Sequence, residues 1–368
     1  MFARFLKNLA TVAVSVALTA LVLEAVLQFM PVHQGFQSVA VNREQPVFHA
    51  RPARIVTSSR DWDFFNARDV RVNNVGFRND QDYTVEGQRP LIAVVGDSYV
   101  EALQVDYADS FFARLAADLD GGARVYSFGF SGAPLSQYLI WARYARDTFQ
   151  ADYLVVVVIS NDFDESLGVW KRGQGFHHYE ACAEADYCLT RVDYEPAVYR
   201  PLVEASALGR YLLYNLQILE IGRKIELLLQ GSREGDEPRF VGNVEVEVDP
   251  KRLEDSRLAI ELFFRDLPAY AGLPPERICF VVDGRVEDET RDVFDESFFG
   301  RTRRYFIDRA EAGGYGVIDM RPVFAYRFTR DGERFESERD GHWNELGHAV
   351  VAEVLAAFYD DKLASSSP

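Results

Sequence analysis

Short, fully apolar runs alternate with helical segments along most of the chain, and this alternation limits the fold more than any other feature. Residues 91–95 and residues 153–159, which contain four consecutive valines, read as strands covered on both faces. Strands separated by helices form parallel sheets with helices on both faces. Further strands are expected at residues 124–128, 278–282 and 317–320, and helices at about residues 109–119, 134–148, 250–266, 296–312 and 345–359.

The alternation of strands and helices, and the places where it stops, divide the chain into segments. We expect a membrane anchor over residues 1–30, a membrane-proximal and irregular segment over residues 31–88, and the main α/β domain over residues 89–360. Residues 164–248 interrupt the alternation, and an apolar-rich helical stretch near residues 208–229 marks them as an insertion. A hairpin is predicted over residues 328–335, around the dipeptide Asp331-Gly332.

The N-terminus is apolar enough for a membrane. Residues 9–30 are nearly all apolar, and Glu24 is their only charge. A run of about 20 such residues spans a bilayer. Arg4 and Lys7 precede it, and positive charge keeps that flank in the cytoplasm and sends the rest of the chain across. A single-pass anchor is therefore predicted, with a cleaved signal peptide as the alternative. Both interpretations export the chain.

Composition excludes some partners and cofactors. Forty Lys and Arg residues against 57 Asp and Glu residues give a net charge of −17, which repels nucleic acid. Three cysteines are too few for a metal cluster. In an oxidising compartment Cys182 and Cys188 form a local disulfide, and two free thiols are the alternative. Cys279 lies in an apolar strand and is predicted to be a core residue.

Four polar segments follow predicted strands or precede the last helix. Ser98 follows the first strand, Gly132 the second and Asn161 the third, while Asp340 and His342 lie just before the final helix. Each segment alone reads equally well as a turn or a helix cap. In an open parallel sheet, however, the ligand crevice lies beyond the carboxyl ends of the strands. We therefore expect all four segments at one rim.

Together these groups predict acyl transfer. Ser98 serves as nucleophile, His342 as its base and Asp340 as the carboxylate that orients the imidazole. The backbone N–H groups of Ser98 and Gly132 and the amide of Asn161 serve as oxyanion donors. No cofactor is expected. No metal is expected either, since the chain has no HExxH motif, and His348 is predicted to pack within the last helix.

The four segments resemble the blocks of the SGNH (GDSL-type) hydrolase family. The matching residues are Gly96-Asp97-Ser98-Tyr99, Phe130-Ser131-Gly132, Ser160-Asn161-Asp162 and Asp340-Gly341-His342-Trp343-Asn344 with Gly347-His348. The resemblance covers residues 71–360 without the insertion. It implies a flavodoxin-like three-layer α/β/α sandwich with the site roles given above. The last block resembles membrane-anchored bacterial members and the related alginate acetylation proteins, which act on exported polysaccharides. The resemblance implies a bacterial inner membrane, with the main domain on the periplasmic side.

Two departures from the family pattern matter. Ile159 stands two residues before Asn161, where the family often has glycine, and one residue rather than two separates Asp340 from His342. By the resemblance we expect an esterase or O-acyltransferase that acts on acyl, above all acetyl, esters of an envelope or extracellular polysaccharide, alongside polysaccharide assembly proteins. Two alternatives remain open. One is a lipid esterase with the same mechanism, and the other is a non-catalytic scaffold of the envelope.

Overall fold

A computed structural model describes residues 2–183, 185–219, 250–284, 297–339 and 341–364. Within these residues the chain divides into two compact units. Unit 1 takes its residues from 1–37, 54–71 and 196–237, and unit 2 takes its residues from 38–53, 72–195 and 238–368. This division into units does not test the predicted domain boundaries at residues 30 and 88, which stay predictions.

Unit 2 is built on one parallel sheet. Its strands are β3 (Leu91–Gly96), β4 (Arg124–Gly129), β5 (Tyr153–Val158), β8 (Ile278–Val282) and β9 (Gly316–Asp319), and every one had been predicted within two residues of its ends. They lie in the order β4-β3-β5-β8-β9, all parallel. By position in the chain this order is 2-1-3-4-5, the flavodoxin-like arrangement. The predicted fold class is confirmed.

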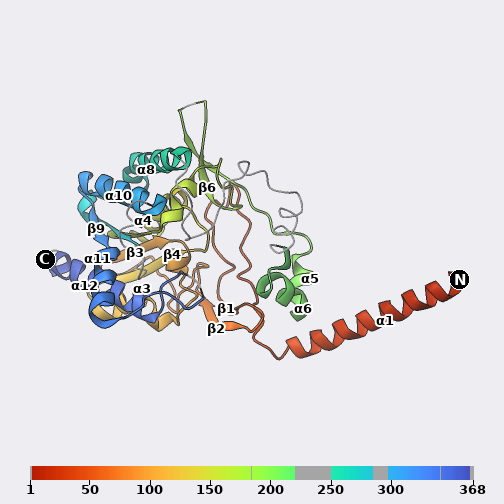
Figure 1. Cartoon of the computed structure of the whole chain (residues 1–368). Coiled ribbons are helices and arrows are strands. Elements are labelled where there is room, and N and C mark those ends of the chain that lie inside the picture. The colour runs from red at the N-terminus through yellow and green to blue at the C-terminus, as the bar shows by residue number, and fades with distance from the viewer. Residues whose placement is uncertain (1, 184, 220–249, 285–296, 340, 365–368) are drawn as a thin grey trace. The chain divides into compact units, whose positions relative to one another are not determined.

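Alternate residues of each strand face two different cores. Leu91, Ala93 and Val95 of β3 join the cluster that packs under α4 (Leu135–Phe149), α8 (Pro250–Ala271) and α10 (Phe298–Ala312). Ile92 and Val94 join the opposite cluster, under α3 (Phe111–Asp118), α11 (Met320–Asp331) and α12 (Glu345–Ala364). Figure 1 shows these two helical layers on either side of the strands. The sheet is therefore buried on both faces, which explains its continuous apolar runs.

The predicted hairpin at residues 328–335 is wrong. Residues up to Asp331 continue α11, and Gly332 ends that helix in the left-handed conformation, with φ +70°. Its N–H donates to the Phe328 carbonyl at 2.8 Å. A glycine after an aspartate suits a helix C-cap as well as a hairpin turn. Phe324 decides between the two, because it is fully buried in the core under α11.

The insertion contains a hairpin that was not predicted. Strands β6 (His177–Glu180) and β7 (Cys188–Arg191) pair antiparallel, and a disulfide joins Cys182 to Cys188 in the connecting turn. Cys279 is buried in β8, as expected of a core residue. The shorter helices of unit 2 are α2 (Ser98–Glu101), η1 (Tyr107–Asp109), η2 (Ser160–Asp162), η3 (Asp164–Ser166) and η5 (Pro275–Arg277).

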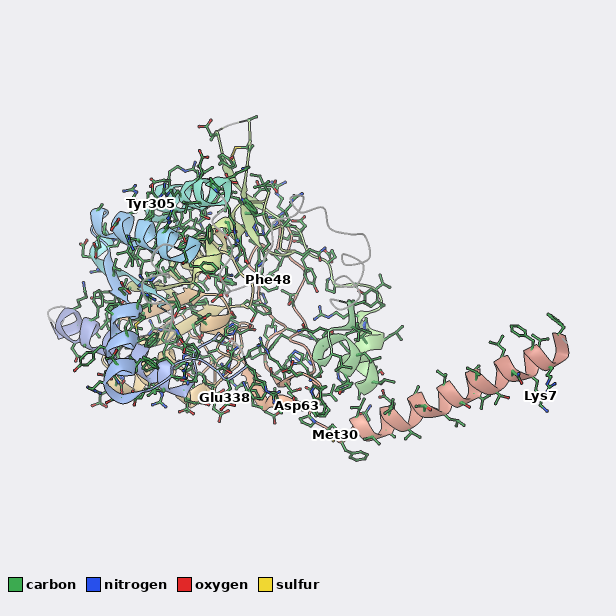
Figure 2. The ribbon with its side chains drawn as sticks, viewed as in Figure 1. Lys7, Met30, Phe48, Asp63, Tyr305 and Glu338 are labelled. Atoms are coloured by element: carbon green, nitrogen blue, oxygen red, sulfur yellow. A yellow bond between two sulfur atoms is a disulfide. The ribbon has the colours of Figure 1, made fainter. Side chains whose placement is uncertain are left out.

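Unit 1 begins with α1 (Phe2–Leu27), the one helix among the described residues that is long and apolar enough to cross a membrane. Figure 2 shows Lys7 toward the N-terminal end of α1 and Met30 just beyond its C-terminal end. Strands β1 (Arg54–Arg60) and β2 (Phe65–Val72) pair within residues 31–88, where irregular structure had been expected. Helices α5 (Arg200–Ala205), α6 (Ala207–Arg210) and η4 (Tyr211–Asn215) follow. The predicted helical stretch beyond residue 219 lies outside the described residues.

Candidate active site

Ser98 is the first residue after the turn that ends β3. The carboxylate of Asp97 holds this turn, because its Oδ1 accepts the Tyr99 N–H at 2.9 Å and its Oδ2 lies 3.2 Å from Ser98 Oγ. The short helix α2 then packs tightly across the end of β4. A side chain at Gly129 would put its Cβ only 2.7 Å from Val100, so glycine permits this approach. Ser98 is thus fixed at the carboxyl end of a buried strand, where a parallel sheet places its ligand crevice.

His342 meets Ser98 although 244 residues separate them. Its Nε2 lies 2.7 Å from Ser98 Oγ, which is hydrogen-bond distance. The loop that carries it closes on itself, because the Ser337 N–H donates to the His342 carbonyl at 2.7 Å. The structure therefore brings together the two side chains that a serine nucleophile and its base require.

The residue next to Ser98 also holds the histidine loop. Tyr99 is almost fully buried, and its hydroxyl donates to the Gly341 carbonyl at 2.6 Å. Its ring centroid lies 4.8 Å from that of His342 and 5.0 Å from that of Trp343. The indole of Trp343 is buried and donates to Asp283 Oδ1 at 2.8 Å. Consecutive residues of α2 thus contact the reactive atom of the imidazole and the backbone that carries it.

The carboxylate predicted to orient the imidazole, Asp340, lies outside the described residues. Its role stays a prediction. On the other side of His342, Asn344 begins α12, since its Oδ1 accepts the N–H groups of Leu346 and Gly347 at 3.0 and 2.9 Å. The cap that had been the alternative interpretation of this segment is therefore present together with the contact between His342 and Ser98.

A buried carboxylate shapes the loop that contains Gly132. Glu101 Oε2 accepts the Ser131 N–H at 2.9 Å and also accepts from the Ser131 hydroxyl. Gly132 follows with φ +78°, a conformation that other residues rarely adopt. Glu101 belongs to α2, three residues after Ser98, so the same short helix positions both Ser98 and the glycine loop.

A second acidic side chain joins Gly132 to Asn161. The Asn161 amide Nδ2 donates to Glu165 Oε1 at 3.2 Å, and Glu165 Oε2 pairs with the Lys171 ammonium. Lys171 Nζ in turn donates to the Gly132 carbonyl at 3.0 Å. Burial raises the pKa of Glu165, and the Lys171 charge opposes that shift. Two of the predicted oxyanion donors are therefore linked through one ion pair.

Buried carboxyls lie beneath the site. Burial raises the pKa of Asp97, while the nearby charge of His342 and the Tyr99 N–H bond act in the opposite direction. Burial also raises the pKa of Asp162 well above its usual value, and repulsion from Asp97 adds to this effect. Asp162 Oδ2 accepts the Ile159 N–H at 2.8 Å and so fixes the chain just before Asn161. Asp97 and Asp162 therefore fix the backbone beside Ser98 and Asn161, respectively.

His348 behaves as predicted for a packed helix residue. It is almost fully buried, its ring stacks on Phe111 at 5.8 Å, and its Nδ1 accepts the Phe111 N–H at 3.3 Å. Burial lowers its pKa to about 3. His348 therefore stays neutral, and it supports the helix that follows the site.

Sequence reasoning missed four positioning residues: Tyr99, Glu101, Glu165 and Lys171. A signal existed for Tyr99 and Glu101, because they lie on one turn of helix directly after Ser98. No signal existed for Glu165 and Lys171. Acidic and basic residues in a loop are normally solvated, and only the fold shows Glu165 to be buried.

Comparison with solved structures finds similar chains at low identity. A lipolytic protein of the G-D-S-L family from Veillonella parvula is 13% identical, with 74% of this chain and 98% of that chain covered and a TM-score of 0.38. A lipase/acylhydrolase from Enterococcus faecalis is 10% identical, with 74% and 96% covered and a TM-score of 0.39. An acetyl xylan esterase, AlAXEase, is 13% identical, with 73% and 98% covered and a TM-score of 0.36.

No protein-family model matches the chain, and no curated protein matches it either. Structural similarity at this level does not define an activity. The chemistry of the site therefore follows from its own residues.

Proposed function

We propose that the protein is a membrane-anchored serine esterase or O-acyltransferase that acts on acyl esters of an exported polysaccharide. The observation that carries this proposal is the 2.7 Å contact between Ser98 Oγ and His342 Nε2. At this distance an imidazole can take the proton of a serine hydroxyl and so activate it as a nucleophile. Their position at the carboxyl end of β3 supports a role at a ligand crevice.

In the first half of the reaction, Ser98 Oγ attacks the ester carbonyl carbon while His342 Nε2 takes the hydroxyl proton. The resulting tetrahedral oxyanion accepts hydrogen bonds from the backbone N–H groups of Ser98 and Gly132 and from the Asn161 amide. The link through Glu165 and Lys171 supports this assignment because it ties Gly132 and Asn161 to each other. One donor of this kind is typically worth about 3 kcal/mol of barrier.

The intermediate then collapses. The bond between the carbonyl carbon and the alcohol oxygen breaks, His342 gives its proton to the leaving sugar hydroxyl, and the acyl group stays on Ser98. In the second half, water or an acceptor hydroxyl attacks this acyl-enzyme, and His342 again takes and returns the proton. Asp340 is proposed to orient the imidazole through Nδ1. Hydrolysis and transfer share each of these steps and differ only in the second nucleophile.

Export is supported by two features. Arg4 and Lys7 flank the apolar helix α1 on one side, which orients the rest of the chain across the membrane. The disulfide between Cys182 and Cys188 fits an oxidising compartment on that far side.

Contacts at the end of α1 favour a retained anchor over a cleaved signal. Leu27 is buried in a small apolar cluster with Val32 and Ala207, and Glu24 bonds to residues 206–208. Removing α1 would open this cluster and leave the start of α6 without its acceptor. A segment that is cut away makes no such lasting contribution to the fold.

The polysaccharide substrate is proposed from the resemblance of the last block to proteins that act on exported polysaccharides. The test is acetate release from O-acetylated bacterial polysaccharides by the full chain in detergent, with Ser98→Ala and the conservative Ser98→Thr compared in parallel. We expect release by the wild type and loss in both variants, because Ser98→Thr adds a methyl group in a tightly packed turn.

Chain-length preference separates the proposal from its alternative. A panel of soluble esters with acetyl, butyryl and octanoyl groups should show the highest kcat/KM for acetyl. A preference for octanoyl esters would replace the polysaccharide substrate by a lipid. Equal activity of wild type and Ser98→Ala on every ester would contradict an enzymatic role for this site.

A further inference from the structure

Unit 1 exposes large apolar side chains that a protein folded in water normally buries. Beyond α1, most of the exposed large apolar residues of the described chain belong to this unit. Phe29 is 90% exposed, Val198 99%, Leu202 75% and Trp62 72%. The others are Met30, Ile55, Tyr199, Ile218 and Leu219. Large exposed apolar side chains concentrated in one part of a chain suggest an interaction site for a membrane or for another protein.

The end of α1 is tied to this surface. Glu24 lies one turn before the end of the helix, and its carboxylate accepts the N–H groups of Ala207 and Leu208 at 2.9 and 2.8 Å. It also accepts the Ser206 hydroxyl at 2.8 Å. The N–H groups of Ala207 and Leu208 belong to the first turn of α6, where the Ser206 hydroxyl oxygen accepts the Gly209 N–H at 2.9 Å. Glu24 therefore completes the cap of that helix from a segment 182 residues away in the sequence.

Packing adds to the polar contact. Leu27 and Val32 are buried against Ala207, with Phe64 and Tyr211 partly buried around them. The rings of Phe64 and Tyr211 lie 5.4 Å apart. The hairpin of β1 and β2 and the helices α5 and α6 are therefore fixed around the end of α1 within the same unit.

The length of α1 sets the depth of this end. At about 1.5 Å per residue, roughly 20 residues cross the 30 Å apolar layer of a bilayer. Counting from Lys7, the last charge before the apolar run, the crossing ends within a turn of Glu24. The residues that Glu24 contacts thus lie at the boundary between lipid tails and headgroups.

We propose that the exposed apolar residues of unit 1 form a collar that lies in the outer interface of the bilayer around α1. This inference rests on the anchored state proposed above. Continuity with α1 favours lipid over another protein. Aromatic side chains such as Trp62 and Tyr199 are also those that prefer the membrane interface.

The experiment measures lipid contact at single positions in the full chain. Leu202→Cys is labelled with the environment-sensitive dye NBD and reconstituted into vesicles of phosphatidylcholine and phosphatidylglycerol. Part of the phosphatidylcholine is brominated in its acyl chains. Tyr326→Cys is the matched control, because Tyr326 is a large, 64% exposed side chain on α11 of unit 2. Native thiols do not interfere, since Cys279 is buried and Cys182 is disulfide-bonded to Cys188.

We expect the label at residue 202 to lose most of its fluorescence to the brominated lipid and the label at residue 326 to keep it. Flotation of the same vesicles reports separately whether the chain is anchored. If the chain floats with the vesicles but residue 202 is no more quenched than residue 326, the collar is wrong and the anchor stands. If the chain does not float, both the anchored state and the collar are wrong.

A second variant tests the link to α1. Glu24→Leu keeps the helix apolar and removes the acceptor for α6, so quenching at residue 202 should fall while flotation is retained. Gln28→Leu is the control, because Gln28 lies just beyond the end of α1 and its side-chain amide donates to Glu24 rather than to α6. Equal quenching in both variants would show that Glu24 does not hold the collar.

Discussion

The two units of this chain treat apolar and acidic side chains in opposite ways. In unit 2 the apolar residues of the sheet are buried on both faces, and the buried carboxylates of Glu101 and Glu165 hold the segments that contain Gly132 and Asn161. In unit 1 large apolar residues are exposed, and Glu24 holds a short helix at the end of α1. The difference agrees with the two environments proposed above, water around the site of Ser98 and lipid around α1.

The largest effect is expected in unit 2, when Ser98 or His342 is replaced. His342→Gln keeps a hydrogen-bonding side chain but cannot accept and return a proton at the serine. We expect kcat on a soluble acetyl ester to fall by about 10⁴- to 10⁶-fold, with Ser98→Ala equally impaired. The double variant should be no worse than either single variant. A steady-state assay measures this, and a fall of less than tenfold in His342→Gln would remove the base from the mechanism.

The next effect concerns the oxyanion donors. Asn161→Ala removes one amide donor and should lower kcat by about 10²- to 10³-fold with little change in KM, because the donor acts on charge that develops only in the transition state. Initial rates across substrate concentrations separate kcat from KM. A rise in KM at constant kcat would instead make Asn161 a substrate-binding residue.

A smaller loss of kcat is expected when the ion pair between Glu165 and Lys171 is broken. Glu165→Gln keeps the shape of the side chain but weakens its hold on Lys171, and Lys171→Met removes the contact with the Gly132 carbonyl. We expect kcat to fall by up to about 100-fold in each variant, and the double variant to match the worse single one.

Glu24→Gln sharpens the comparison, because it alters a carboxylate of unit 1. It should leave kcat and KM on a soluble ester unchanged. If Glu24→Gln and Glu165→Gln reduced kcat to the same extent, the two carboxylates would not have the separate roles assigned to them.

The smallest effect is one of stability. His348 is neutral in the folded chain, with its pKa lowered to about 3, and has an ordinary pKa of 6.5 when unfolded. Between these values the unfolded state binds one more proton, so acid destabilises the fold. Relative to His348→Gln, the free energy of unfolding of the wild type should fall by about 1.4 kcal/mol per pH unit as the pH drops from 6 to 4. Denaturant unfolding in detergent at several pH values measures it, and parallel curves would contradict the buried neutral state.

The strands of the sheet could be predicted because most of them are short, mainly apolar runs between helical segments, while the flavodoxin-like arrangement followed from the family resemblance. Each of β3, β4, β5, β8 and β9 carries its own local signal. Ser98, Gly132, Asn161 and His342 could be named for a related reason, since each lies directly after such a strand or just before the last helix. The local apolar pattern and the rule for parallel sheets were together enough to select these residues as candidates.

The rest depends on tertiary contacts that no local pattern encodes. Glu165 looks like a solvated loop residue until the fold buries it beside Lys171. Asp331-Gly332 fits a hairpin turn and a helix end equally well, and the burial of Phe324 decides for the helix. Likewise Glu24 read as a lone charge in an apolar run, and only the structure shows it capping α6.

The most direct measurement of the central claim is covalent labelling of Ser98 by a fluorophosphonate, located by peptide mass spectrometry. In the folded full chain we predict rapid modification at Ser98, which should be abolished in His342→Gln and in the denatured wild type. Absence of modification at Ser98 in the folded wild type, or equal modification in His342→Gln, would contradict the account.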